Sequence, residues 1–289
     1  MTTLIAFSSV DSEGVSAIYL ASDSRLSWDT TDGGILSWDH GKKVFYSQRS
    51  PLIMGYCGDV LFPTQILSQI IDLLDNNLLS LDNLSPIDVF SEISNLIKHS
   101  FDNFPKIVIT KSFTIIICGR DNASGDFYCY ELAWKEVKVE EQDKKEWKWV
   151  DKPKDINKIQ SDVIAAYGSG GDNFNNFKTL YAKSDFYGKT RGIFNCFYNA
   201  IKSQKDSRSG GVPQLVGIYE DKAGKCLGVI SEGQRYLNGM HINNNCNYNN
   251  IKWVNELFEV CDGDTLERGE NQQRHIKPNN IKAYSDVYE

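Results

Sequence analysis

Short, largely apolar runs separated by polar and glycine-containing turns occupy roughly the first sixty residues, a pattern typical of strands. We expect strands over residues 2–9 and 15–21, joined by a turn at 11–14, and a second pair over 43–47 and 52–57. From Val60 the apolar spacing becomes helical and predicts a helix to about Leu79. Ser85 and Pro86 then provide a capping hydroxyl and a first-turn proline for a second helix.

The second half of the chain repeats this order of strands followed by helices. Strands are expected over residues 113–119, 127–133, 162–167, 213–219 and 225–229, and helices over roughly 172–183 and 189–202. The charged segment after Trp134, which also holds Trp147 and Trp149, is expected to be an extended hairpin or an exposed insertion. Runs of strands alternating with helix pairs predict sheets stacked between helical layers.

The domain organisation follows from where this pattern ends. We expect one domain over residues 1–231 with an insertion near 134–158. Residues 232–289 are polar and rich in asparagine, apart from one apolar stretch at 253–260, and are expected to form a C-terminal extension that ends in an extended arm.

The composition narrows the class of protein. The chain has 289 residues, of which 41% are hydrophobic and 24% charged, as in an ordinary globular protein. Its net charge of -7 argues against nucleic acid or an anionic membrane as the main partner. No apolar run is long enough to span a bilayer, and the N-terminus does not resemble a signal peptide. With seven scattered cysteines, an odd number, these features predict a cytoplasmic protein with reduced thiols.

Thr2, directly after Met1, suggests a class of reaction. An aminopeptidase can remove Met1 because threonine is small, and Thr2 then carries a hydroxyl and an α-amine on one residue. An α-amine has an ordinary pKa of about 7.7–8.0 and is therefore suited to accept the hydroxyl proton near neutral pH. Many proteins begin Met-Thr, so this feature alone does not decide for catalysis.

Five short segments line up behind Thr2. They are Ala21-Ser22-Asp23-Ser24-Arg25, Gly41-Lys42-Lys43-Val44, Gly55-Tyr56-Cys57-Gly58-Asp59, Tyr167-Gly168-Ser169-Gly170-Gly171 and Asp206-Ser207-Arg208-Ser209-Gly210-Gly211. Each one alone could be a plain turn or a solvated strand end. In this order, the set resembles the proteasome β-subunit family and the bacterial HslV peptidase, including the more distant Anbu-type proteins. The resemblance covers about residues 2–231.

The resemblance implies a fold and a catalytic centre. The fold would be the four-layer αββα sandwich of N-terminal-nucleophile hydrolases, with two antiparallel sheets between helix pairs. Thr2 matches the nucleophile, Lys43 the active-site lysine, and Asp23 the carboxylate that holds this lysine. Gly58 matches the glycine whose backbone N–H helps to form the oxyanion hole.

Four more residues match positions around this centre. Ser169, Asp206 and Ser209 match the group that surrounds the threonine amine, and Arg25 matches the arginine that usually follows Asp-Ser. Hydroxyls at the two serine positions can bond the amine and a water molecule, and a carboxylate can orient them. A lysine cation beside the threonine would favour the deprotonated hydroxyl.

The resemblance also implies a reaction and an assembly. A threonine peptidase would hydrolyse peptides or unfolded protein through an ester on Thr2, with no metal or organic cofactor. Such enzymes work in homo-oligomeric rings or related assemblies, and folded substrates would need a separate ATPase unfoldase. The residues that match the specificity pocket are apolar and predict cleavage after hydrophobic residues; they are Leu26, Phe45, Tyr56 and Val60.

Other interpretations stay open at this point. A small-molecule amidase and a non-catalytic assembly subunit could both use the same fold. Cys226, His241, Cys246 and Cys261 could suggest zinc, but their spacing matches no standard site. Residues 168–171 lack the Gly-Lys-Ser/Thr ending of a phosphate-binding loop.

Overall fold

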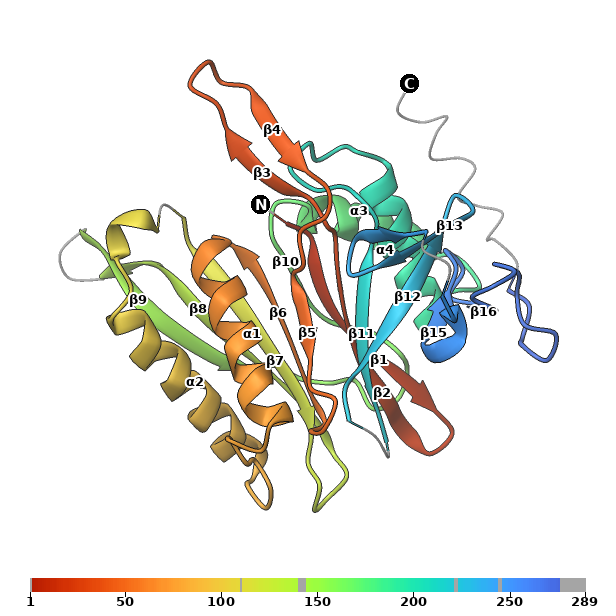
Figure 1. Cartoon of the computed structure of the whole chain (residues 1–289), viewed down its shortest axis with the longest axis horizontal. Helices are drawn as coiled ribbons and strands as arrows, with labels where there is room; N and C mark the ends of the chain where they lie inside the picture. The colour runs from red at the N-terminus through yellow and green to blue at the C-terminus, as the bar shows by residue number, and fades with distance from the viewer. Residues whose placement is uncertain (1, 110, 140–143, 221–222, 244–245, 276–289) are drawn as a thin grey trace.

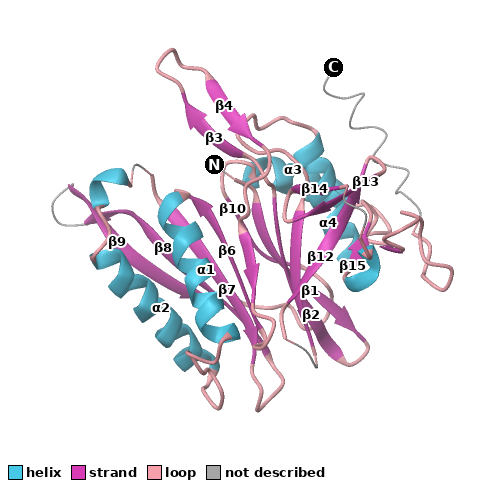
Figure 2. Cartoon of the chain, in the orientation of Figure 1, coloured by secondary structure: helices cyan, strands magenta, loops and turns pink. Residues whose placement is uncertain are grey.

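A computed structural model describes residues 2–109, 111–139, 144–220, 223–243 and 246–275 of the chain (Figure 1). Within these ranges the molecule contains two large sheets, one separate ribbon and four α-helices (Figure 2). No helix of the described part combines the length and apolar character needed to cross a membrane.

The first sheet has nine strands and contains the start of the chain. Along its main path the order is β10 (Val163–Tyr167), β1 (Leu4–Asp11), β2 (Gly14–Ser22), β11 (Gln214–Tyr219), β12 (Lys225–Ser231), β13 (Gln234–Leu237) and β14 (Met240–Ile242). Two short strands lie off this path, β15 (Lys252–Val254) beside β12 and β16 (Val260–Cys261) beside β15. The pairing of β12 with β15 is parallel, and the other pairs of this sheet are antiparallel.

The second sheet has five antiparallel strands in chain order. They are β5 (Val44–Tyr46), β6 (Leu52–Gly58), β7 (Phe113–Arg120), β8 (Phe127–Val139) and β9 (Lys144–Pro153). A separate two-stranded ribbon, β3 (Leu26–Asp29) with β4 (Ile35–Trp38), projects from the body of the molecule (Figure 1). The predicted hairpin between residues 134 and 158 is confirmed as the outer part of β8–β9.

Two helix pairs pack on these sheets. They are α1 (Leu61–Asp75) with α2 (Pro86–Asp102), and α3 (Gly171–Tyr181) with α4 (Thr190–Lys202); short 3₁₀ turns cover Lys106–Val108 and Tyr248–Asn250. The predicted start of α2 is confirmed, because the Ser85 side chain accepts a hydrogen bond from Asp88 N and Pro86 occupies the first turn. Each of the four helices lies close to its expected position.

Successive side chains along a strand contribute to different apolar clusters, one beneath the helices and one between the two sheets. In β1, Ile5 and Phe7 pack in the cluster that includes α3 and α4, whereas Leu4 and Ala6 face the second sheet. In β7, Ile115 packs in the cluster that includes α1 and α2. Successive side chains of a strand point to opposite faces, so an uninterrupted apolar strand can serve both clusters.

The four-layer αββα sandwich predicted from the resemblance is wrong. The structure is mostly β, with 36% strand against 24% helix, and it is not a sandwich flanked throughout by helices. The extra strands come from segments expected to be loop or tail. Strands β13–β16 surround a small apolar cluster of Ile230, Trp253 and Cys261 that contains no residue of the four α-helices. The expected C-terminal extension therefore continues the sheet up to β16, before the expected arm begins, and residues 276–289 lie outside the described residues.

Candidate functional site

A buried ion pair lies where β2 ends and β5 begins. The side chains of Asp23 and Lys43 are both fully buried, and Lys43 Nζ lies 2.8 Å from Asp23 Oδ1. Lys43 Nζ also donates a hydrogen bond to the carbonyl oxygen of Arg25 at 2.5 Å. Burial lowers the pKa of Lys43 below its ordinary value, and the Asp23 carboxylate opposes that shift. The neighbouring Lys42 is exposed, so the second lysine of the segment is the one in the buried pair.

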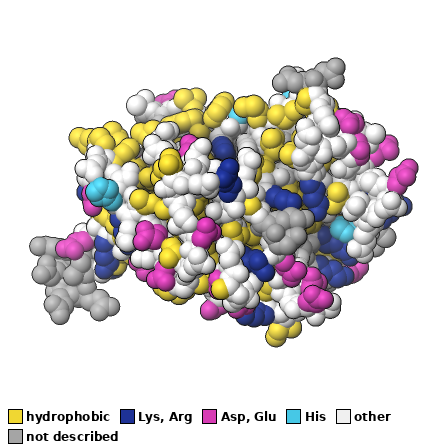
Figure 3. All heavy atoms as spheres, turned by 60° about the horizontal axis from the view of Figure 1, so that its bottom comes forward, with side chains coloured by type: hydrophobic (Ala, Val, Ile, Leu, Met, Phe, Trp, Pro, Cys, Tyr) yellow, Lys and Arg dark blue, Asp and Glu magenta, His cyan; other side chains and the backbone are white. Residues whose placement is uncertain are grey.

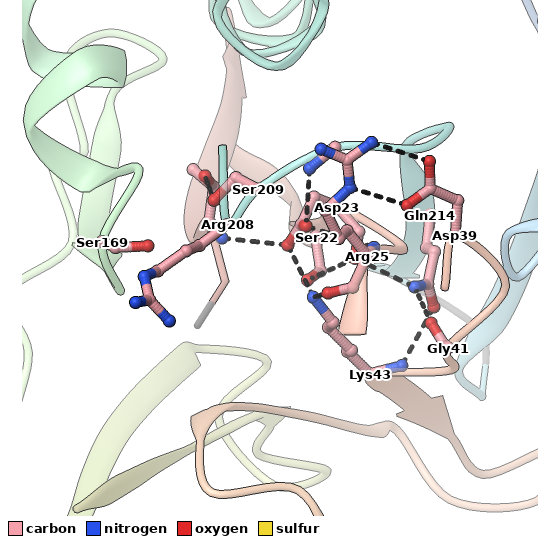
Figure 4. A network of polar contacts seen from close by, with 12 residues as sticks. Ser22, Asp23, Arg25, Asp39, Gly41, Lys43, Ser169, Arg208, Ser209 and Gln214 are labelled. Atoms are coloured by element: carbon pink, nitrogen blue, oxygen red, sulfur yellow. Dashed lines mark hydrogen bonds and ion pairs between the residues drawn. The ribbon is translucent and has the colours of Figure 1, made fainter. Parts of the chain in front are cut away.

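Backbone donors hold the Asp23 carboxylate in place (Figure 4). Its Oδ1 accepts a hydrogen bond from Thr3 N at 2.9 Å, in addition to the one from Lys43. Its Oδ2 accepts bonds from Gly210 N at 3.0 Å and from Arg25 N at 3.2 Å. A buried ion pair is favourable only when the remaining lone pairs and donors of its two groups are also hydrogen-bonded. Here backbone N–H groups from three segments bind the carboxylate. Asp23 thereby fixes Lys43 relative to the residue after Thr2.

A second hydrogen-bond network, built from hydroxyl groups around Asp206, also ends on Thr3. Ser169 Oγ and Ser209 Oγ both donate to Asp206 Oδ2, at 2.6 and 2.7 Å. Thr3 Oγ1 donates to Ser209 Oγ at 2.9 Å. Burial would raise the pKa of Asp206, but the hydrogen bonds from Ser169 and Ser209 outweigh burial, and the pKa lies below its ordinary value. Asp206 is therefore ionised near neutral pH and orients both serines.

Thr2 is packed against the glycine loop that follows β10. Gly168 has a φ of +89°, and a Cβ at this position would lie 1.7 Å from the carbonyl oxygen of Thr2. A Cβ at Gly170 would lie 1.9 Å from Thr3 Oγ1. Only residues without a Cβ allow this close approach of two backbones. The loop therefore brings Ser169 beside the first residues of β1, and Thr2 itself is buried.

An open cleft of about 840 Å³ begins at this centre. Gly58, Gly168 and Ser169 are among the residues that line it. Gly58 ends β6 with a φ of +99°, and a Cβ there would lie 2.1 Å from the carbonyl oxygen of Ser112. The proposed oxyanion glycine thus lies at the cleft, together with the loop that packs on Thr2.

The four residues predicted to form the specificity pocket do not line this cleft. Phe45 and Tyr56 are buried in the cluster beneath α1 and α2, with ring centroids 6.4 Å apart. Val60 packs against the same cluster, and Leu26 fills the space beside Gly41. Alternation places the side chains of Phe45 and Tyr56 on the helix-covered face of the second sheet, and this face is remote from solvent.

Three residues of the site were missed at the sequence level. Gln214 is fully buried; its Oε1 accepts from Lys43 N at 3.0 Å, and its Nε2 donates to the carbonyl oxygens of Asp23 at 3.1 Å and Gly41 at 2.5 Å. A glutamine inside an apolar strand was the available signal. Thr3 was overlooked beside Thr2, and no local pattern pointed to Asp39.

Asp39 holds the predicted arginine. Arg25 Nε and Nη2 donate to the two oxygens of Asp39 at 2.7 and 2.9 Å, a bidentate pair (Figure 4). Arg25 Nη1 also donates to the carbonyl oxygen of Ser207 at 3.1 Å. Arg25 thereby anchors the loop that carries Asp206 and Ser209, and its side chain takes no part in the Asp23–Lys43 pair.

Comparison with known proteins assigns no family. No protein-family model matches the chain, and no curated protein matches it. Within the described ranges, no three His, Cys, Asp or Glu side chains are grouped so that they could hold a metal ion.

Proposed function

We propose that the chain is an N-terminal threonine peptidase whose nucleophile is Thr2, freed by removal of Met1. One observation carries the proposal. A single oxygen of Asp23 binds both Lys43 Nζ and Thr3 N. The hydrogen-bond network that links Ser169, Asp206 and Ser209 ends on Thr3 Oγ1. Two polar networks from distant segments thus converge beside the one residue that can carry both hydroxyl and α-amine.

The first half of the proposed reaction forms an ester. Thr2 Oγ1 attacks the carbonyl carbon of the scissile peptide bond, and the α-amine of Thr2 accepts the hydroxyl proton. The electron pair of the C=O bond moves onto oxygen, where the backbone N–H of Gly58 would stabilise it. One such donor is typically worth about 2.7–4 kcal/mol. The C–N bond then breaks, and the leaving amine takes the proton from the α-ammonium group.

The second half releases the acyl group. A water molecule attacks the ester carbonyl while the α-amine accepts a proton from that water. Collapse of the intermediate breaks the bond to Thr2 Oγ1, which recovers its proton, and the carboxylic acid product departs. Amine and hydroxyl end in their starting states.

The surrounding residues supply charge and orientation in this proposal. Protonated Lys43, held by Asp23, favours negative charge on the Thr2 oxygen. Ser169 and Ser209, oriented by Asp206, would bind the amine and the water. Only Thr2 exchanges covalent bonds with the substrate.

Assembly, substrate delivery and location are part of the same proposal. A homo-oligomeric ring or related assembly, fed by a separate ATPase unfoldase, rests on the family resemblance. A cytoplasmic location is supported by the seven cysteines, all of which are free thiols.

Peptide hydrolysis by matched variants tests the proposal. The full chain, with loss of Met1 verified by mass, should release fluorophore from extended peptides. Thr2→Ala should reduce the rate at least about 1,000-fold, and Thr2→Ser should retain part of it. Thr179→Ala, at an exposed position of α3, is the control and should not change the rate. Turnover of small acyl amides only would indicate an amidase, and no Thr2-dependent turnover would indicate a non-catalytic subunit.

A further inference from the structure

Three charged residues from distant segments meet at the cleft. Asp29 ends β3, Lys111 precedes β7, and Arg208 lies between Asp206 and Ser209. Lys111 Nζ lies 2.9 Å from Asp29 Oδ2, and Arg208 Nη2 forms an ion pair with Asp29 Oδ1. Asp29 and Lys111 line the cleft. Figure 4 shows the Arg208 side chain pointing away from the Asp23–Lys43 pair, on the side of Ser169. We call these three residues the charged bridge.

The charged bridge has an excess of positive charge. Hydrogen bonds from Arg208 and Lys111 lower the pKa of Asp29 to about 2, so this carboxylate is ionised near neutral pH. Two cations therefore face one anion. On the molecular face in Figure 3, by contrast, acidic and basic side chains are interspersed, and the whole chain carries a charge of -7.

The other two charged residues that line the cleft, Lys135 and Glu136, balance each other and leave this excess in place. Lys135 also lines the cleft, and its Nζ lies 3.8 Å from Glu131, a carboxylate that Lys154 and the Tyr167 hydroxyl already bind. Glu136 lines the cleft too, but Lys145 lies 3.3 Å from it. The cleft thus favours an anionic group over a cationic one.

Hydrogen-bond donors remain for such a group. A lysine ammonium has three donors, and Lys111 uses one of them on Asp29 while its side chain stays 39% exposed. Arg208 Nη1 has no hydrogen-bond partner among the described residues, but it is shielded from solvent, so the accessible donors are those of Lys111. Asp29 holds both cations in place without occupying all their donors. A second carboxylate can therefore bind beside Asp29.

We infer that the cleft selects acidic peptides, with Lys111 binding a substrate carboxylate near the nucleophile and the adjacent Arg208 adding positive charge. Asp29 acts as a positioning residue for the two cations. The inference deepens the proposed function and depends on it for cleavage, although binding does not require catalysis. It replaces the expected preference for hydrophobic residues, because Phe45, Tyr56 and Val60 pack in the core and none of the four residues behind that expectation lines the cleft.

Peptide binding to the uncleaving variant Thr2→Ala tests the inference. The probes are two fluorescein-labelled alanine hexapeptides that carry either two glutamates or two glutamines at the central positions. By fluorescence anisotropy at low salt, the glutamate peptide should bind about tenfold more tightly, since its carboxylates can accept charge-assisted hydrogen bonds in the cleft. The difference should shrink as salt is raised, because the cleft is open to solvent.

Variants in the Thr2→Ala background then locate the effect. Lys111→Gln and Arg208→Gln should each remove most of the tenfold difference. Lys158→Gln, which alters an exposed ion pair with Asp126, is the matched control and should preserve it. Thermal unfolding checks that each variant is folded. If Arg208→Gln unfolds, the exposed Lys111 still decides the outcome.

Each outcome bears on one proposal or the other. Equal affinity for the two peptides, or a difference that survives Lys111→Gln and Arg208→Gln, overturns the charged bridge as the selective element. Tighter glutamate binding without any Thr2-dependent hydrolysis leaves the cleft assignment intact and overturns the peptidase. Hydrolysis of both peptides at equal kcat/KM supports the peptidase and overturns the acidic preference.

Discussion

Asp23 and Lys43 form an ion pair from which solvent is excluded, with 2.8 Å between Oδ1 and Nζ and neither side chain exposed. The same Oδ1 binds Thr3 N, so the pair is fixed relative to the first strand. Breaking such a pair leaves an uncompensated charge in the interior, which typically costs about 3–5 kcal/mol. The pair is therefore important for stability as well as for the proposed chemistry.

Lys43→Met should lower the free energy of unfolding by about 3–5 kcal/mol, because Asp23 stays buried without its partner. Lys42→Met is the matched control at the adjacent, exposed position, where the ammonium lies 4.8 Å from the centre of the Phe45 ring. It should cost less than about 1 kcal/mol. Urea unfolding of both variants measures the difference. If both variants lose the same free energy of unfolding, the buried ion pair does not stabilise the fold as described.

Gly168→Ala should be much more destabilising than Gly233→Ala. Both glycines have positive φ, +89° and +72°, so both variants carry the strain of a left-handed residue, about 1–2 kcal/mol. A Cβ at Gly233 meets open space, whereas one at Gly168 would lie 1.7 Å from the Thr2 carbonyl oxygen. We expect the unfolding free energies to differ by at least about 2 kcal/mol. Similar unfolding free energies for the two variants would mean that the Gly168 loop does not pack tightly against Thr2.

Gln214→Leu should destabilise the chain by about 3 kcal/mol, since it removes the partners of Lys43 N and of two buried carbonyl groups. Gln234→Leu, at an exposed position of β13, is the control and should change stability by less than about 0.5 kcal/mol. Thermal and urea unfolding give the comparison. If Gln214→Leu is as stable as Gln234→Leu, the Gln214 side chain does not link β11 to the ion pair as described.

Asp206 should make stability sensitive to acid. Its pKa in the folded chain is below the ordinary value, so its contribution is fully present above about pH 3.9 and is lost as the pH falls through the folded-state pKa. Stability of Asp206→Asn should therefore fall less than that of the parent between about pH 5 and pH 2.5. Asp102→Asn, at an exposed position of α2, is the control. Parallel stability curves for the parent and Asp206→Asn would contradict this assignment.

The sequence predicted those features that local patterns determine. Helical spacing after Val60 and the Ser85-Pro86 start located α1 and α2, because periodicity and capping act over a few residues. The matched segments correctly paired Asp23 with Lys43 and Asp206 with both serines. These positions came from the resemblance, since nothing local brings residues so far apart together.

Features that depend on long-range pairing could not be predicted. Strands β13–β16 are only two to four residues long: β13 and β15 pair with β12, β14 pairs with β13, and β16 pairs with β15. The resulting excess of strand is the reason why the four-layer prediction failed. Likewise, Lys111 and Asp29 are 82 residues apart in sequence, and only the fold brings them to one cleft. The apolar pocket was mispredicted because an apolar residue next to a site can equally belong to the core.

The most direct test of the central claim is mass mapping of the N-terminal peptide after treatment with a peptide epoxyketone. If Thr2 is a free N-terminal nucleophile, the chain has lost Met1, and the adduct lies on Thr2. The adduct should be absent from Thr2→Ala and strongly reduced in Lys43→Met relative to Lys42→Met. A chain that retains Met1 and carries no adduct, or an adduct on another residue, would contradict the account.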